Sequence, residues 1–192
     1  MKHFYLLRHT VYDNPENIFH GRLPLDLSRE GRGQAQKIAA WFKDKHIARI
    51  YSSAVKRCRS MSKIVSKAIG APVSFDKRLL EILTVIQGMN MDAYRKDKQM
   101  RFANVSELGG ESMMDIQIRM LDFFYEKMKS EKENIIICSH GDPLYFLYLG
   151  LAKRNLPETV DAIDRSEYQK KGTVRRVDIE GEKYSIGPII EP

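Results

Sequence analysis

Short apolar runs alternate with amphipathic segments along most of the chain. The runs have the length and composition of buried strands, and they occupy residues 4–7, 49–51, 73–75 and 135–138. The segments between and after them carry apolar positions at helical spacing, and they occupy residues 28–45, 54–69, 112–128 and 142–152. This alternation predicts an α/β fold, a three-layer α/β/α sandwich with a mostly parallel central sheet.

Turn and capping residues mark the ends of several elements. Ser28 has the side chain of a helix N-cap. Gly70 is placed to end the second helix in a left-handed conformation. Near the end of the chain, runs at 173–180 and 183–189 flank a Glu-Gly turn. We expect these runs to form an antiparallel hairpin at an edge of the sheet.

Residues 85–110 break the alternation. The stretch 94–101 is charged and only weakly periodic, and 103–110 has the composition of a loop. At 192 residues the chain allows one domain with a full core. We therefore predict a single domain, residues 1–192, with a small lid inserted at 85–110. The basic run in the lid is either a solvated face or a contact for a carboxylate or second phosphate of a substrate.

Composition excludes several classes of protein. The chain is 43% hydrophobic and 30% charged, and no apolar run approaches the ~20 residues needed to cross a bilayer. The first apolar stretch is too short for a signal peptide, and Arg8 interrupts it. Cys58 and Cys138 suit a reducing compartment, so we expect a cytoplasmic protein. Clusters with zinc or magnesium spacing are missing, and we expect neither a metal nor another cofactor.

The net charge of +7 favours an anionic ligand. The lysines and arginines are spread along the chain, without a nucleic-acid module or a basic tail. We expect a small phosphorylated molecule as the partner, with neither a specific nucleic acid nor a membrane. The sequence assigns no oligomeric state.

Two histidines follow predicted strands directly. His9 comes after the run 4–7 and His140 after the run 135–138. In an open α/β sheet, loops at the carboxyl ends of strands build the ligand crevice. Arg8 beside His9 adds a planar fork of donors that matches phosphate oxygens. The pattern predicts a cationic pocket for a phosphate dianion.

Ordered motifs over about residues 3 to 150 carry a family resemblance. They are Arg8-His9, the stretch 20–31 followed by Gln34-Ala35, the stretch 52–57, Leu80-Glu81-Ile82, the stretch 109–112 and Ser139-His140-Gly141. Each motif is weak evidence alone. Together and in this order, they resemble the histidine phosphatase superfamily, which includes phosphoglycerate mutase and many small phosphatases.

The resemblance implies a role for each motif residue. His9 is the expected nucleophile, which carries the phosphoryl group as phosphohistidine. Arg8 and Arg57 are the expected phosphate clamp, with Arg59 as the competitor of Arg57 on the same helix. His140 is the expected second histidine of the pocket. Its pKa should rise beside a bound anion, and the glycine after it lets the backbone approach the ligand closely.

Two further roles rest on looser matches. The resemblance implies that Glu81 is the general acid, which protonates the leaving oxygen and later deprotonates water. The family pattern after it differs here, where Val85-Ile86-Gln87-Gly88 stands. The phosphate-contacting asparagine of the family falls on Asn14, and Asn17 is the alternative. The other histidines, His3, His20 and His46, are assigned to structure or surface, although the loop of His20 lies near the site in the family.

The leading hypothesis is a metal-independent phosphomonoester hydrolase. It acts on small anionic metabolites of the phosphoglycerate or sugar phosphate type through a phosphohistidine. The alternatives are a phosphoglycerate mutase and a noncatalytic protein that binds a phosphorylated ligand on the same fold. The resemblance implies additional insertions and a closing tail for the mutase, and a binding protein would not need His9 or Glu81. We therefore favour the hydrolase.

Overall fold

A central sheet organises the computed structural model, which describes residues 1–102 and 109–192. Within these residues the sheet has six strands in the order β3-β2-β4-β1-β5-β6. The strands are β1 (Lys2–Arg8), β2 (Ile47–Ser52), β3 (Val73–Phe75), β4 (Asn134–Ser139), β5 (Val174–Glu180) and β6 (Lys183–Ile190). The neighbours from β3 to β1 pair in parallel, whereas β5 is antiparallel to both β1 and β6. The mostly parallel sheet and the hairpin at its edge are confirmed.

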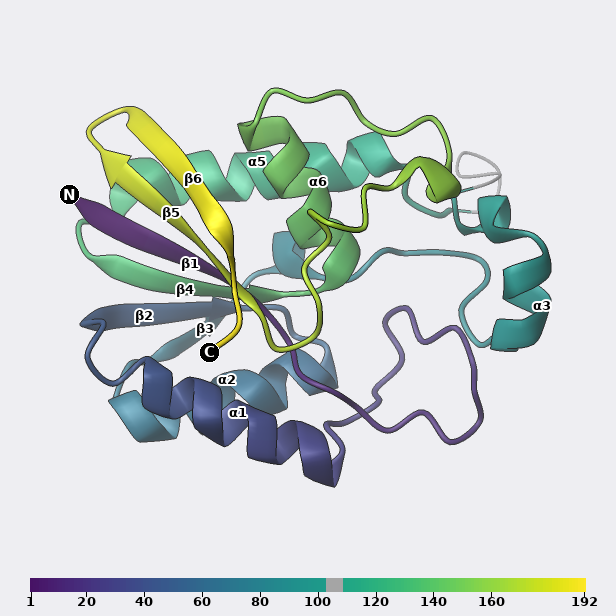
Figure 1. The fold of residues 1–192 in the computed structure, drawn as a ribbon, viewed down its shortest axis with the longest axis horizontal. Helices are drawn as coiled ribbons and strands as arrows, with labels where there is room; N and C mark the ends of the chain where they lie inside the picture. Colours follow the sequence, from purple (N-terminus) through teal and green to yellow (C-terminus); the bar gives the residue numbers. More distant parts are fainter. Residues whose placement is uncertain (103–108) are drawn as a thin grey trace.

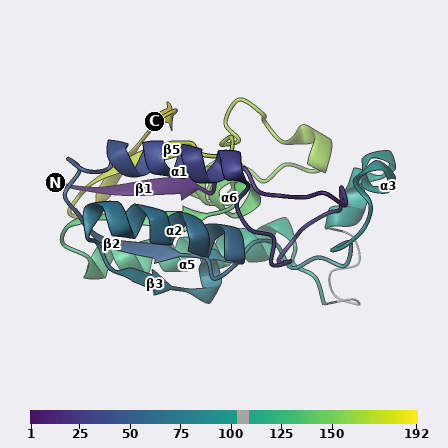
Figure 2. The same cartoon turned by 90° about the horizontal axis from the view of Figure 1, so that it is seen from below.

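Helices cover both faces of the sheet, which confirms the three-layer α/β/α architecture (Figures 1 and 2). The first face carries α1 (Arg29–Trp41) and α2 (Lys56–Ile69), and the second carries α5 (Met113–Ser130) and α6 (Gly141–Leu151). Each face buries its own apolar cluster. Consecutive strand residues therefore point into different clusters, as Leu6 and Leu7 do. Strands buried on both faces explain why the sequence shows continuous apolar runs.

The helix boundaries follow the capping residues. The Ser28 side chain accepts a hydrogen bond from the backbone nitrogen of Gly31 at 3.0 Å, as an N-cap does. Gly70 ends α2 with φ of +76°. The first helix ends at Trp41 and not at residue 45, because the chain turns through residues 42–46 to enter β2.

The inserted segment contains more regular structure than its weak periodicity predicts. It forms α3 (Met91–Lys96) and a 3₁₀ turn (Lys98–Arg101), at the end of the molecule opposite the β5–β6 hairpin (Figure 1). Side chains of Asn90 and Asp97 cap these two turns. Capping side chains therefore stabilise the N-termini of two short helical turns that the apolar pattern does not predict. Most of the loop predicted at 103–110 lies outside the described residues.

The insertion packs on the loop that follows β1. Phe19 from that loop forms a small apolar cluster with Ile86 and Tyr94. The backbone nitrogen of Phe19 also donates to the carbonyl oxygen of Met89 at 2.6 Å. Residues 85–102 and the loop after β1 thus pack together beside the carboxyl ends of the strands (Figure 2).

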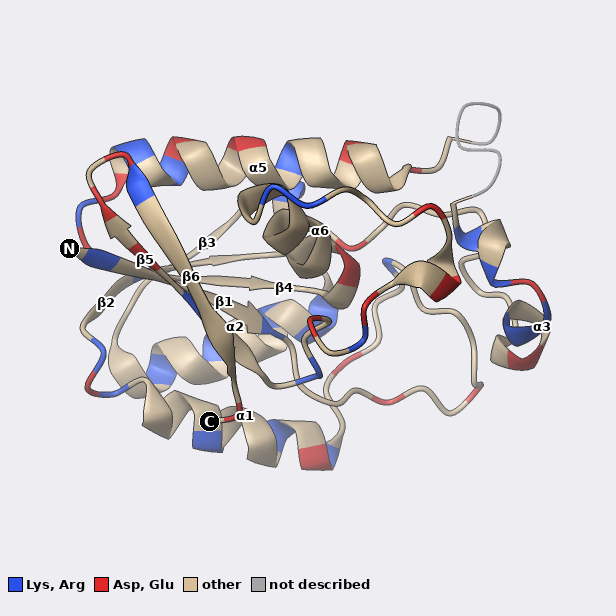
Figure 3. Ribbon diagram, turned by 45° about the horizontal axis from the view of Figure 1, so that its top comes forward, with Lys and Arg blue, Asp and Glu red and all other residues tan. Residues whose placement is uncertain are grey.

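Charged residues are spread over the outer elements of the described fold. Lys and Arg occur on the helices, the hairpin and the inserted segment, with Asp and Glu among them (Figure 3). Among the helices of the described residues, we find none whose length and apolar character would let it cross a bilayer.

Candidate active site

The two predicted histidines meet at the centre of the sheet. Arg8 ends β1 directly opposite Ser139, which ends the parallel neighbour β4. The backbone nitrogen of His9 donates to the carbonyl oxygen of Ser139 at 3.2 Å, and the ring centroids of His9 and His140 are 5.2 Å apart. Both rings are buried. The strand ends therefore bring together residues that are far apart in the sequence.

Arg57 lies in the first turn of α2 and connects the two histidines. Its Nε donates to Nε2 of His9 at 3.1 Å, and its Nη2 donates to the Gly21 carbonyl oxygen at 2.9 Å. Nη2 is also 2.9 Å from Nδ1 of His140. Arg59, by contrast, is exposed and lies over the ring of Phe75. Of the two candidate arginines, Arg57 is the one in the cluster.

The hydrogen bonds of His9 fix its tautomer. Its Nδ1 is 2.8 Å from the carbonyl oxygen of Thr10, which can only accept, so Nδ1 carries the proton. Nε2 is then unprotonated and accepts from Arg57. Burial, followed by the charges of Arg57 and Arg8, holds the pKa of His9 well below its usual value. His9 is a neutral imidazole with a lone pair that faces a guanidinium group.

His140 has the opposite tautomer. An arginine can only donate, so Nδ1 of His140 accepts from Arg57, and Nε2 carries the proton toward the Ser53 hydroxyl at 2.8 Å. Burial, followed by the charge of Arg57, holds the pKa of His140 well below its usual value. The rise expected beside a bound anion stays a prediction for the phosphate complex.

Glu81 follows a short 3₁₀ turn (Lys77–Leu79) and reaches the same cluster. Its Oε2 is 3.5 Å from Nη2 of Arg57 and 3.7 Å from Nδ1 of His140. The Glu81 side chain is 6% exposed. Burial, and then the charge of Asp142, raises the pKa of Glu81, although Arg57 opposes the shift. A carboxyl group that keeps its proton can serve as an acid.

Arg8 points toward the loop before β5. Its Nη1 donates to the carbonyl oxygen of Gln169 at 2.5 Å, and its Nε is buried without a partner among the described residues. A Cβ on Gly141 would lie 2.2 Å from the Tyr168 hydroxyl and 2.9 Å from Cζ of Arg8. Gly141 therefore makes room for side chains of this chain, where the sequence predicted room for a ligand.

The structure does not bring Asn14 into this cluster. Its amide nitrogen donates to the Ile18 carbonyl oxygen at 2.9 Å, and its amide oxygen accepts from the Ile18 nitrogen at 3.2 Å. Asn17 is exposed and has φ of +49°. Contact of Asn14 with phosphate stays a prediction that requires its side chain to leave Ile18.

Two residues that the sequence analysis did not place in the site, Tyr12 and His20, lie near His9. The Tyr12 ring lies edge-on to the His9 ring at 5.5 Å, and its hydroxyl is 2.8 Å from Nδ1 of His20. Burial and the nearby cations, Arg57 first, lower the pKa of His20 to about 2. Its assignment to structure or surface therefore missed a neutral histidine within the site. The only sequence signal for His20 was that its loop lies near the site in the family.

A buried ion pair also lies beside the site. Asp142 in the first turn of α6 forms an ion pair with Arg101 and accepts a hydrogen bond from the Tyr168 hydroxyl at 2.8 Å. The Arg101 side chain is only 13% exposed and lies over the ring of Phe19. The prediction of a solvated face over 94–101 is thus wrong for Arg101, because packing against Phe19 turns it inward. Arg95 and Lys96 are exposed, and Lys98 is half-buried.

Metal-ligating side chains are not grouped in the parts of the chain that the structure describes: no three His, Cys, Asp or Glu residues there are placed to hold an ion. Positive charge at the centre of the site comes from the guanidinium groups of Arg8 and Arg57.

Comparison with known proteins identifies the class. The model of the histidine phosphatase superfamily (branch 1) matches residues 4–186. The chain therefore belongs to the histidine phosphatase superfamily.

Two relatives and one solved structure show how similar individual proteins are to this chain. The chain is 29% identical over 168 residues to "Putative phosphoserine phosphatase 2" of Hydrogenobacter thermophilus, covering 81% of this chain and 83% of the relative. It is 28% identical over 186 residues to "Probable phosphoglycerate mutase GpmB" of Escherichia fergusonii, covering 88% and 86%. The solved structure of Bacillus stearothermophilus YhfR matches with a TM-score of 0.82 at 22% identity, covering 97% of this chain and 95% of YhfR. That likeness confirms the fold.

Proposed function

We propose that this protein is a metal-independent phosphomonoester hydrolase that acts on small phosphorylated metabolites through a phosphohistidine on His9. The observation that carries the proposal is the tautomer of His9, whose unprotonated Nε2 faces the guanidinium of Arg57. Such an imidazole can attack phosphorus, and the guanidinium can bind the oxygens of the phosphoryl group that is transferred.

In the first half-reaction, Nε2 of His9 forms a bond to phosphorus as the ester P–O bond breaks. The electron pair of the P–O bond leaves with the alcohol oxygen, which takes the proton of Glu81. The raised pKa of Glu81 supports this role, because the carboxyl group holds its proton at pH values where an ordinary glutamate is ionised.

In the second half-reaction, water attacks phosphorus and the P–N bond breaks. The Glu81 carboxylate accepts the proton of the attacking water, and the electron pair of the broken bond returns to Nε2 of His9. Inorganic phosphate leaves and the enzyme regains its starting protonation. The same carboxyl group thus acts as an acid and then as a base.

Unused hydrogen-bond donors support phosphate binding at this position. Nη1 of Arg57 and Nε of Arg8 are buried and lack a partner among the described residues. Buried donors without partners are costly, and phosphate oxygens would satisfy both of them. An incoming phosphate must also replace the bond between Arg57 and His9, which frees the lone pair for attack.

The test is a phosphate-release assay with a chelator present. We expect turnover of p-nitrophenyl phosphate, and of some members of a panel of phosphoglycerates, sugar phosphates, nucleotides and phosphoamino acids. The rate should stay within about twofold when EDTA is added, because arginines rather than a metal stabilise the transferring group. Loss of activity with EDTA that Mg²⁺ or Mn²⁺ restores would contradict the mechanism.

The same assay separates the hydrolase from a mutase, the function that the name of the Escherichia fergusonii relative suggests. A mutase interconverts 2- and 3-phosphoglycerate and releases little inorganic phosphate. Product analysis by NMR distinguishes the two outcomes.

A further inference from the structure

The loop that precedes β5 is fastened to the strand that carries the nucleophile. Since β5 is antiparallel to β1, it begins at the edge of the sheet where β1 ends. The backbone nitrogen of Gly172 donates to the His9 carbonyl oxygen at 3.1 Å, and the nitrogen of Arg8 donates to the Thr173 carbonyl oxygen at 3.1 Å. The backbone directly after residue 171 is therefore held in place beside the candidate site.

Lys171 extends from this loop to the mouth of the site. Its Nζ is 4.4 Å from the centroid of the Tyr12 ring, and Cζ of Arg57 is 5.5 Å from the same centroid. Lys171 is solvent-accessible, so an incoming ligand can reach it. Partial desolvation of the ammonium and the charges of Arg8 and Arg57 lower the pKa of Lys171.

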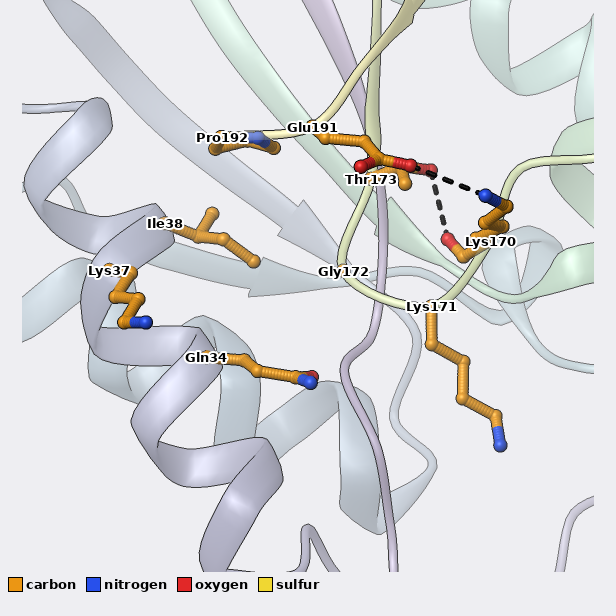
Figure 4. A pocket seen from close by; sticks show the side chains of 9 residues that line it. All are labelled: Gln34, Lys37, Ile38, Lys170, Lys171, Gly172, Thr173, Glu191 and Pro192. Atoms are coloured by element: carbon orange, nitrogen blue, oxygen red, sulfur yellow. Dashed lines mark hydrogen bonds and ion pairs between the residues drawn. The ribbon is translucent and has the colours of Figure 1, made fainter.

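The adjacent lysine behaves differently. Nζ of Lys170 is 3.5 Å from the carboxylate of Glu191, whereas no carboxylate of the described residues lies within 4.0 Å of Lys171 Nζ. The two side chains leave the loop in different directions, Lys170 toward Glu191 and Lys171 away from it (Figure 4). Lys170 is therefore paired with a carboxylate, whereas Lys171 lies near the positive charges of Arg8 and Arg57.

The charge balance of the site leaves room for a second anionic group. The positive side chains are Arg8, Arg57, Arg101 and Lys171, which all lower the pKa of His20. The described carboxyl groups beside them are those of Glu81 and Asp142.

In the proposed reaction Glu81 starts protonated, so the four cations face one charged carboxylate, that of Asp142. The site then carries three net positive charges, and a phosphate dianion neutralises two. Lys171 is the most accessible of these cations, and no carboxylate of the described residues is paired with it. The positive charge that the phosphate does not neutralise is therefore assigned to Lys171.

We propose that Lys171 is a specificity-determining residue that binds a second negative group on the substrate, so that the enzyme selects phosphate monoesters whose leaving group carries a carboxylate. This inference rests on the proposed function for the position of the phosphate. It is independent of how the phosphoryl group is transferred.

Two phosphate esters that differ by one charge test the proposal. In glycerol 3-phosphate a neutral hydroxymethyl group replaces the carboxylate of 3-phosphoglycerate. We would measure each compound as a competitive inhibitor of p-nitrophenyl phosphate hydrolysis, and by calorimetry. The wild-type protein should bind 3-phosphoglycerate at least about tenfold more tightly, as expected for one charge-assisted contact.

Three variants give the readout. Lys171→Ala should reduce the preference to about twofold or less, while Lys171→Arg should keep it. The matched control is Lys170→Ala, which removes a lysine from the same loop and should keep the wild-type preference. A preference that survives Lys171→Ala, or that Lys170→Ala reduces as strongly, would overturn the proposal.

Failure of the proposed function looks different. A wild-type protein that hydrolyses none of the phosphate esters contradicts the hydrolase, and the calorimetric preference still tests Lys171. A wild-type protein that hydrolyses p-nitrophenyl phosphate but binds the two inhibitors equally contradicts the role of Lys171 alone.

Discussion

The two sides of the candidate site are built in different ways. On the sheet side, His9, Arg57 and His140 follow buried strands or open a long helix, and each is at most 1% exposed. On the other side, Glu81 and Arg101 come from the connection between β3 and α5, which is held by short capped turns and a small apolar cluster. Elements of the central sheet fix the first group, and local packing of loops fixes the second.

This difference corresponds to the two parts of a phosphate ester. The phosphoryl group is the same in every substrate, so rigid strand ends suit the groups that hold and attack it. The alcohol part varies, and loops on a rigid scaffold can vary with it. We therefore expect substitutions on the sheet side to affect all substrates, and substitutions on the loop side to have effects that depend on the substrate.

The largest effect should come from His9→Ala, which removes the proposed nucleophile. We expect turnover of every substrate to fall to background. A wild-type reaction with a labelled ester should give a protein label that is lost in acid and kept in base, as phosphohistidine is. His46→Asn, a change at an exposed histidine, serves as the control. An acid-stable label, or clear activity of His9→Ala, would remove His9 as the nucleophile.

The next effect should come from Arg57→Ala. Loss of a preorganised donor to the transferring group costs ~3 kcal/mol, or about a hundredfold in kcat. We expect this loss for all esters alike, because in the proposed mechanism Arg57 contacts the phosphate that every ester carries. Arg59→Ala, an exposed arginine two residues later on the same helix, should stay within about twofold of wild type. Similar losses in both variants would mean that α2 contributes stability rather than a phosphate clamp.

Glu81→Gln should have a smaller effect that depends on the leaving group. The amide keeps the shape of the side chain but cannot protonate the leaving oxygen, so alkyl phosphates should slow far more than p-nitrophenyl phosphate. An equal deficit for both kinds of ester would exclude Glu81 as the acid.

The pH profile gives a second measurement on Glu81. Because burial and Asp142 raise its pKa, wild-type kcat on alkyl phosphates should decline only as the pH rises through that raised value. Glu81→Gln should lack this decline. A profile that is unchanged by the substitution would assign the titration to another group.

The sequence alone predicted the sheet side better than the loop side. His9 and His140 could be placed because each follows an apolar strand, and strand ends of a parallel sheet share one edge. Arg57 could be preferred to Arg59 by its match to the family motif, and the structure buries Arg57 while it leaves Arg59 exposed.

The loop side could not be predicted in the same way, because tertiary packing decides it. Arg101 belongs to a charged run with weak periodicity, and only its contact with Phe19 turns it toward Asp142. The reason for Gly141 was likewise hidden, since the crowding side chain, Tyr168, is 27 positions later in the sequence. Lys171 gave no signal at all, because its place depends on the antiparallel direction of β5.

The position of β1 in the sheet has a consequence for how the protein is made. This strand precedes all other strands of the sheet in the sequence, yet its neighbours in the sheet, β4 and β5, are synthesised long after it. Until they emerge, the apolar Phe4–Leu7 stretch has no strand to pair with, and unpaired strands of this kind favour aggregation. A nascent chain that already contains His9, Arg57, Glu81 and His140 therefore still lacks the strand that encloses β1 on its second side. Catalytic competence should appear late in translation, after residue 180 has cleared the exit tunnel.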